Sequence, residues 1–102
     1  MLLQPSEAEG FGLPVAEAMA CGTPVIASAI ASLMEVGGNA GIYCKVAAID
    51  EWISAACNLI AERTSESRWK DRRRKLIQNA ERFSWQDHAR QMVEIYERVL
   101  SC

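Results

Sequence analysis

The chain has 102 residues, of which half are hydrophobic, and its formal net charge is −2 at pH 7. This length suits one small domain or part of one, and the near-neutral charge excludes a polyanion such as nucleic acid as an expected partner. The sequence contains no apolar run of membrane-spanning length and no signal-peptide pattern, so we expect a cytoplasmic protein.

The first half of the chain is predicted to alternate between strand and helix. The expected elements are a strand at 1–4, a helix at 14–21, a strand at 24–28, a helical turn at 31–36 and a strand at 41–44. Pro14 suits the first position of a helix, and Gly22 suits the left-handed residue beyond a helix end. The apolar run at 24–28 is typical of a buried parallel strand.

The second half is predicted to be helical. Apolar residues recur at helical spacing at Ile49, Trp52, Ile53, Ala56 and Ile60 and, less regularly, at Trp69, Leu76, Ile77, Ala80 and Phe83. Ser84 with Asp87 resembles a capping box, which would start a last helix. The apolar face of that helix would be Trp85, Ala89, Met92, Tyr96 and Val99. We therefore predict an α/β fold with a short parallel sheet followed by three C-terminal helices.

The cysteines, the histidine and the basic run do not indicate a metal or nucleic-acid site. The four cysteines, at positions 21, 44, 57 and 102, lack zinc-type spacing. We expect reduced thiols, with Cys21 and Cys57 in the core because they occupy apolar helical positions. The single histidine, His88, has no partner for a metal site. The basic run at 70–75 is diluted by acids, which favours a solvated helix face.

The loop before the first helix has features that suit a nucleotide-linked ligand. Gly10 and Gly12 lack a Cβ, so a ligand can approach their amides closely. The start of the helix carries a partial positive charge and free N–H groups, which favour a phosphate. Glu9 and Glu17, the latter predicted in the first helical turn, can only accept hydrogen bonds when ionised. These two carboxylates would therefore bind sugar hydroxyls.

The same residues also fit plainer interpretations. A Gly-x-Gly before a helix is common, and a glutamate in a first turn is often only a partner of the helix dipole. The residues by themselves leave a ligand site and an ordinary loop equally open. A dinucleotide site of the NAD type is disfavoured, because its fingerprint needs a third glycine where this chain has Val15.

One segment resembles a known family. The sequences QPS at 4–6, EGFGLP at 9–14 and EAMACGTPVIAS at 17–28 resemble the hallmark segment of retaining GT-B glycosyltransferases, the glycosyl transferase group 1 family (family 4). The likeness continues more loosely through residues 32–42 and 83–85. It implies a partial Rossmann-like C-terminal domain of a GT-B fold. Residues 1–102 would be the C-terminal part of the donor-binding domain, with the N-terminal domain absent.

The resemblance also implies roles for the residues around its E-x7-E motif. Glu9 would contact hydroxyls of the donor sugar and is the residue implied for catalysis, while Glu17 would contact the ribose. The backbone amides that would approach the donor sugar and its diphosphate are those of Gly10, Phe11, Gly12 and Leu13. No metal and no cofactor is implied, because a helix dipole and basic side chains would stabilise the departing diphosphate.

The implied reaction is transfer of a hexose from a nucleotide-diphosphate sugar to an acceptor hydroxyl, with retention. The acceptor would be a sugar, a lipid or a small molecule. We expect the fragment alone to be inactive, because the acceptor-binding domain and the upstream basic pair are missing, and we expect membrane-surface contact only through the missing domain. Met34 and Lys45-Val46 depart from the family pattern. Two alternatives stay open: a non-catalytic nucleotide-sugar-binding or interaction module, and a relic of such an enzyme.

Overall fold

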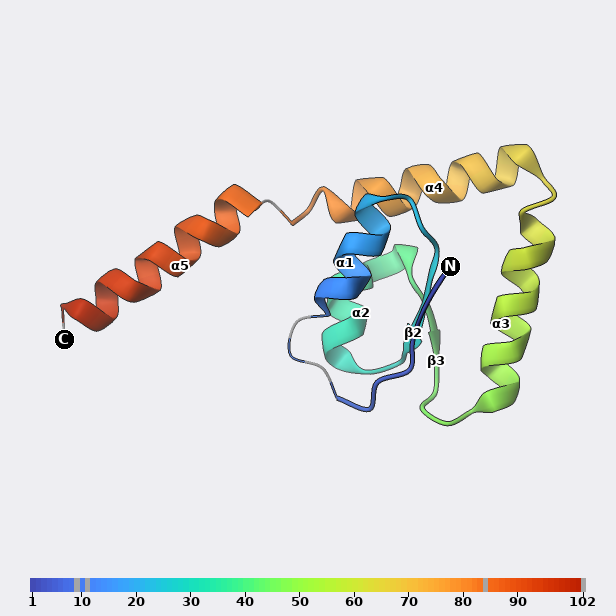
Figure 1. Ribbon diagram of the computed structural model, residues 1–102, viewed down its shortest axis with the longest axis horizontal. Helices are drawn as coiled ribbons and strands as arrows, with labels where there is room; N and C mark the ends of the chain where they lie inside the picture. The colour runs from blue at the N-terminus through green and yellow to red at the C-terminus, as the bar shows by residue number, and fades with distance from the viewer. Residues whose placement is uncertain (9, 11, 84, 102) are drawn as a thin grey trace.

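The computed structural model describes residues 1–8, 10, 12–83 and 85–101, without the side chains of residues 85–88. The elements in chain order are β1 (Leu2–Gln4), α1 (Leu13–Ala20), β2 (Val25–Ser28), α2 (Ala31–Gly37), the 3-10 helix η1 (Gly38–Ala40), β3 (Ile42–Cys44), α3 (Ile49–Glu62), α4 (Glu66–Ala80) and α5 (Trp85–Leu100). They confirm the predicted α/β class, in which a short parallel sheet is followed by three helices (Figure 1).

The sheet has three parallel strands in the order β1-β2-β3. In this register Leu3 pairs with Ile26, and Ile26 pairs with Ile42. All four residues of β2 are buried, as expected for a strand that has a neighbour on each side and helices on both faces. The apolar run that the sequence placed at 24–28 is therefore the centre of the fold.

The two faces of the sheet bury separate apolar clusters, because successive strand residues point to opposite faces. The larger cluster packs against α1, α2 and α4, and its buried members are Val15, Met19, Val25, Ala27, Leu33, Val36 and Leu76. The smaller cluster packs against α3, and its buried members are Ile26, Cys44 and Leu59. Figure 1 shows α3 on the opposite side of the sheet from α1 and α2.

Helix α4 closes the larger cluster and also holds the end of α2. The Nδ2 of Asn79 donates a hydrogen bond to the carbonyl of Val36 at 3.0 Å. One guanidinium nitrogen of Arg82 donates to the carbonyls of Glu35 and Val36, at 3.1 and 3.2 Å. Carbonyls in the last turn of a helix lack intrahelical partners, so these two side chains supply the bonds that α2 cannot make for itself.

Helix α5 extends away from the rest of the structure (Figure 1). Its described side chains, from residue 89 to residue 100, are all exposed. The predicted apolar face is present, with Met92, Tyr96 and Val99 at 39%, 62% and 65% exposure. The predicted capping box at Ser84 and Asp87 lies outside the described residues and side chains. Within the described part of the chain, no helix is long and apolar enough to cross a membrane.

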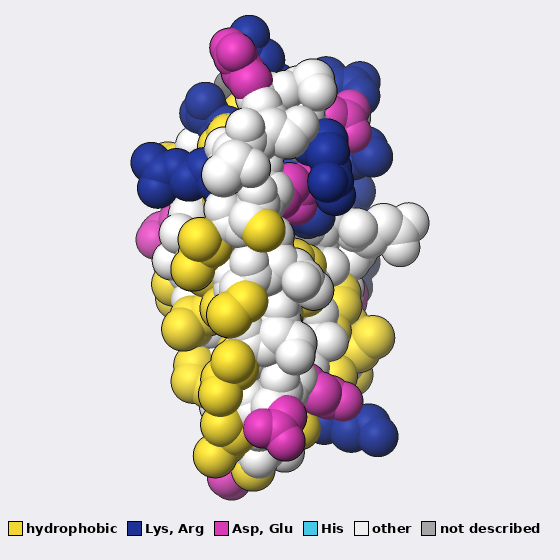
Figure 2. Space-filling view, turned by 90° about the vertical axis from the view of Figure 1, so that its right-hand side faces the viewer, with side chains coloured by type: hydrophobic (Ala, Val, Ile, Leu, Met, Phe, Trp, Pro, Cys, Tyr) yellow, Lys and Arg dark blue, Asp and Glu magenta, His cyan; other side chains and the backbone are white. Residues whose placement is uncertain are grey.

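The prediction that two of the cysteines lie in the core is wrong. Cys21 and Cys57 are exposed, because Cys21 follows the last residue of α1 and Cys57 lies off the sheet-facing side of α3. The helix predicted from the spacing of residues 49–60 is present as α3, in which the isoleucines are exposed and Leu59 is buried. Figure 2, which views the side of the molecule where α3 lies, shows a row of exposed hydrophobic side chains.

Candidate functional site

The glycine loop begins at the carboxyl end of β1. A hydrogen bond from the neighbouring strand β2 holds the backbone at this point. The Nε2 of Gln4, the last residue of β1, donates to the hydroxyl of Ser6 at 2.8 Å. The fully buried Ser28, at the end of β2, donates its hydroxyl to the carbonyl of Gln4 at 3.4 Å. Ligands of open parallel α/β sheets bind outside the carboxyl ends of the strands, so this edge is the candidate site.

Gly12 is required at the entrance to α1 for two independent reasons. Its φ is 73° and its ψ is 37°, in the left-handed region that disfavours residues with a Cβ. A Cβ built there would also lie 2.9 Å from Cδ2 of the buried Leu33 on α2. Gly10, by contrast, has open space where a Cβ would stand. Gly12 thus anchors the loop on α2, while the backbone at Gly10 is accessible to a ligand.

The first turn of α1 offers fewer free amides than the sequence suggested. The helix begins at Leu13, which places Pro14 second rather than first. Pro14 has no N–H, and the N–H groups of Val15 and Ala16 both donate to the carbonyl of Gly12, at 3.0 and 3.3 Å. In this turn the amide of Leu13 is therefore the one that a phosphate could engage directly.

Glu17 lies in the second turn of α1, not in the first turn as predicted. The shift follows from the helix start at Leu13, and it removes the plain interpretation of Glu17 as a first-turn partner of the helix dipole. The Glu17 side chain is exposed and makes no ion pair or hydrogen bond with the described residues. Leu13 and Glu17 are four residues apart and so share one face of the helix, which points the carboxylate to the same side as the Leu13 position.

The structure therefore brings together three of the predicted site residues, Gly12, Leu13 and Glu17, at one helix start. Gly10 lies in the loop that leads to it. Glu9 and Phe11 lie outside the described residues, so the pairing of the two glutamates stays a prediction. Among the described residues no group of three or more histidine, cysteine, aspartate or glutamate side chains could hold a metal ion.

Cys44, at the carboxyl end of β3, is not a candidate nucleophile. Burial raises the pKa of its thiol above the ordinary 9.0, and the nearby carboxylate of Glu51 raises it further. The thiolate is the reactive form of cysteine, so at neutral pH this thiol is protonated and inert. Its place in the smaller apolar cluster marks it as a packing residue.

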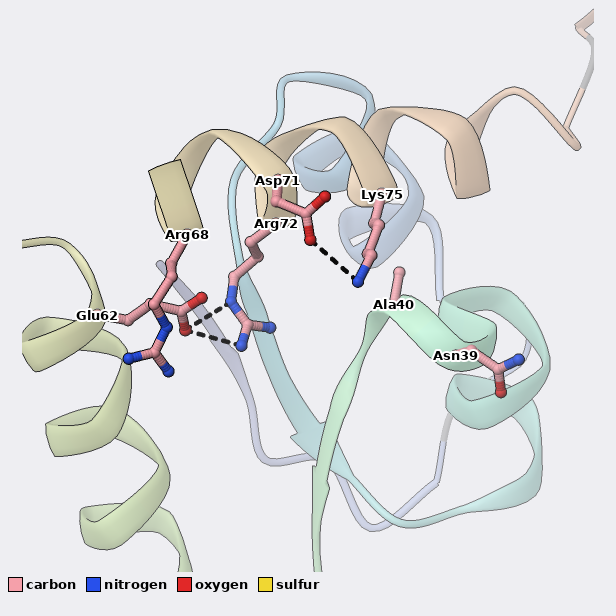
Figure 3. A pocket seen from close by; sticks show the side chains of 7 residues that line it. All are labelled: Asn39, Ala40, Glu62, Arg68, Asp71, Arg72 and Lys75. Atoms are coloured by element: carbon pink, nitrogen blue, oxygen red, sulfur yellow. Dashed lines mark hydrogen bonds and ion pairs between the residues drawn. The ribbon is translucent and has the colours of Figure 1, made fainter. Parts of the chain in front are cut away.

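A cleft that the sequence did not predict lies near the opposite end of the sheet (Figure 3). It has a volume of about 240 Å³, and its lining residues are Asn39, Ala40, Glu62, Arg68, Asp71, Arg72 and Lys75. The sequence showed only a diluted basic run in this region, because the lining comes from η1, α3 and α4. The spacing of Arg68, Arg72 and Lys75 along one helix face was the available signal.

The chain matches the family described as "Glycosyl transferases group 1" over residues 1–83. It is 40% identical over 95 residues to "O-antigen chain mannosyltransferase B" of Escherichia coli, a match that covers 91% of this chain and 24% of that protein. It is 38% identical over 100 residues to "MMP alpha-(1->4)-mannosyltransferase" of Mycolicibacterium hassiacum, covering 95% and 24% of the two chains.

A solved structure is also similar. Sucrose-phosphate synthase from Thermosynechococcus elongatus superposes with a TM-score of 0.73 and 31% sequence identity, covering 97% of this chain and 25% of that one. The chain thus spans about a quarter of the length of the relatives that it matches.

Proposed function

The chain belongs to the glycosyl transferases group 1 family, and from that premise we propose that it is the C-terminal part of the donor-binding domain of a retaining GT-B glycosyltransferase. The intact protein would transfer a hexose from a nucleotide-diphosphate sugar to an acceptor hydroxyl. Mannosyltransferases among the relatives support a hexose as the transferred group. The superposition on sucrose-phosphate synthase supports the GT-B architecture.

One observation carries the proposal. The exposed carboxylate of Glu17 has no partner among the described residues, and it stands one turn from the Leu13 amide at the carboxyl edge of the sheet. An ionised carboxylate accepts hydrogen bonds from hydroxyl groups, whereas a helix start attracts a phosphate. A nucleotide-diphosphate sugar carries both groups, so its ribose hydroxyls fit Glu17 and its diphosphate fits the amide of Leu13.

The remaining roles follow the same chemistry. The Glu9 carboxylate would accept hydrogen bonds from hydroxyls of the donor sugar and stabilise positive charge that develops on the sugar. The Leu13 amide and the dipole of α1 would stabilise negative charge on the departing diphosphate, an effect that is strongest when the donors are fixed beforehand. The backbone at Gly12 lies so close to Leu33 that a Cβ would clash there, and this close packing would hold the donors in place. Transfer also needs an acceptor held close by, so we propose that these 102 residues alone bind the donor and do not catalyse transfer.

The test is donor binding by the full 102-residue chain. Calorimetric titration with UDP, GDP and ADP identifies the base that binds, and the titration is repeated on Glu17→Gln. Loss of a hydrogen bond to a charged group is expected to weaken binding about 10- to 100-fold.

Glu97→Gln, an equal change at an exposed site on α5, is the matched control and is expected to bind as the unchanged chain does. Absence of nucleotide binding by the unchanged chain, or equal affinities of the two variants, would contradict the role given to Glu17. Turnover of a nucleotide sugar by the chain alone would contradict the proposed inactivity.

A further inference from the structure

Three cationic side chains form a row on one face of α4. Arg68, Arg72 and Lys75 follow one another at helical spacing and all line the cleft of about 240 Å³ described above. Figure 3 shows their side chains leaving α4 toward η1 and the end of α3. Like charges four residues apart on a helix repel one another, so Arg68 and Arg72 need negative charge nearby.

The acidic residues of the cleft neutralise two of the three cations. Glu62, whose side chain is 11% exposed, holds Arg72 by an ion pair of 2.8 Å. Asp71 pairs with Lys75 at 3.0 Å and also with Arg74. Hydrogen bonds from Arg74 and Lys75 hold the pKa of the Asp71 carboxyl below its ordinary value, so it is a carboxylate at neutral pH.

Arg68 is left without a partner within the described part of the chain. Its guanidinium carries five N–H donors, and neither an ion pair nor a hydrogen bond to a described residue uses them. Across the cleft, η1 contributes Asn39 and Ala40 to the lining, and Figure 3 shows the amide of Asn39 directed away from Arg68 and Arg72. The lining therefore holds one net positive charge, a free guanidinium and several carboxylate oxygens that can accept further hydrogen bonds.

We propose that this cleft binds a small soluble phosphomonoester that also carries hydroxyl groups, such as a hexose phosphate. The phosphate would bind Arg68 by paired N–H···O bonds, the geometry that guanidinium groups favour. The hydroxyls would donate to Glu62 and Asp71. A volume of about 240 Å³ lies below the range usual for drug-sized ligands, which favours a single phosphorylated sugar over a nucleotide sugar.

This site is separate from the candidate donor site. The donor residues stand at the carboxyl ends of the strands, whereas η1 directly precedes β3 and so lies at the amino end. Figure 1 shows α4 crossing that end of the sheet, away from the start of α1. A ligand in the cleft would join α3, α4 and η1, and would therefore stabilise the fold in proportion to its binding.

The experiment titrates the full chain with glucose 6-phosphate, followed by calorimetry and by amide chemical shifts of residues 39 and 40. Arg68→Ala is expected to weaken binding about 10- to 100-fold without loss of helical circular dichroism, because Arg68 has no partner among the described residues to lose. Lys70→Ala removes the same charge from an exposed site on α4 that does not line the cleft and is expected to change affinity less than about twofold. Arg68→Lys should restore part of the affinity.

Further titrations distinguish a soluble sugar phosphate from inorganic phosphate and from a lipid headgroup. Inorganic phosphate should compete with glucose 6-phosphate, glucose should not, and vesicles containing phosphatidic acid should bind no better than vesicles without it. No saturable binding, equal losses in Arg68→Ala and Lys70→Ala, or binding to phosphatidic acid that glucose 6-phosphate does not displace would each overturn the proposal. Glu17→Gln should leave this binding unchanged, which separates its outcome from that of the donor site.

Discussion

The α/β body formed by residues 2–83 and the helix α5 both carry apolar residues at helical spacing, yet only the body buries them. Val15 and Met19 of α1 are fully buried, whereas Met92, Tyr96 and Val99 of α5 are exposed to between 39% and 65%. The match to the glycosyl transferases group 1 also ends at residue 83. An apolar stripe shows that a helix needs a partner, but the partner must come from elsewhere in the fold.

This comparison predicts that substitutions in the body are costly and that equal substitutions in α5 are not. Leu76→Ala empties a site that is 1% exposed in the larger apolar cluster and should lower the free energy of unfolding by about 2–5 kcal/mol. Val99→Ala on α5 should change it by less than about 0.5 kcal/mol. Urea unfolding followed by circular dichroism measures both changes. Similar losses for the two variants would contradict the difference in burial between the body and α5.

Within the body, a second pair of variants sharpens the same contrast at the glycine loop. Gly12→Ala places a Cβ at a φ of 73° and 2.9 Å from Leu33 Cδ2, and should cost about 1–3 kcal/mol. Gly10→Ala meets open space and should leave the unfolding free energy nearly unchanged. Urea midpoints distinguish the two, and an unaffected Gly12→Ala would mean that α2 does not support the loop.

The hydrogen bond between Asn79 of α4 and the end of α2 is expected to contribute less to stability. Asn79→Ala removes the hydrogen bond to the carbonyl of Val36, which keeps a second donor in Arg82. We expect a loss of about 1 kcal/mol, measured by thermal unfolding. Gln78→Ala, on the exposed side of the same helix, is the control and should melt as the unchanged chain does. A larger loss in Gln78→Ala than in Asn79→Ala would contradict this role of Asn79.

The smallest expected effect is a dependence on alkaline pH that belongs to the body alone. Burial raises the pKa of Tyr43 above its ordinary 10.0, with Arg82 opposing the shift, and it raises the pKa of Cys44 above 9.0. The folded state therefore holds these protons more tightly than the unfolded state. Their contribution to stability is complete below pH 9 and falls as the pH rises through the folded pKa values.

Urea midpoints at pH 7.5, 9.0 and 10.5 should decline only over the upper interval, and Tyr43→Phe should flatten that decline. Because the Tyr43 hydroxyl also donates to the carbonyl of Gly38 at 2.7 Å, the variant should start from a lower midpoint at pH 7.5. An identical alkaline decline in both proteins would assign it to other groups.

Local sequence predicted the elements better than their environments. Gly22, with a φ of 72°, ends α1 as expected, and the strand predicted at 24–28 is the buried centre of the sheet. The start of α1 differed by one residue because Gly12 takes the left-handed conformation and caps the helix. That single residue moved Glu17 from the first turn to the second.

The functional residues also differ in how far the sequence alone could place them. Gly12, Leu13 and Glu17 lie within six residues of one another, so their spacing already placed them at one helix start. The cleft around Arg68 depends on residues from η1, α3 and α4, which are brought together only by packing. The exposure of Cys21 and Cys57 could not be predicted either, because helical periodicity does not say which of two adjacent stripes meets the sheet.

The sequence by itself determined the order of strands and helices, the parallel α/β class and the glycine loop that marks the family. These features depend on backbone preferences and on residues close together in the chain. Only the tertiary structure decided that α3 buries Leu59 rather than Ile60 and that the described apolar side chains of α5 are exposed. It also decided that Arg68 lines a cleft with Glu62 and pairs with no residue in the described part of the chain. Burial and charge pairing are properties of contacts between distant segments, and such contacts exist only after the chain has folded.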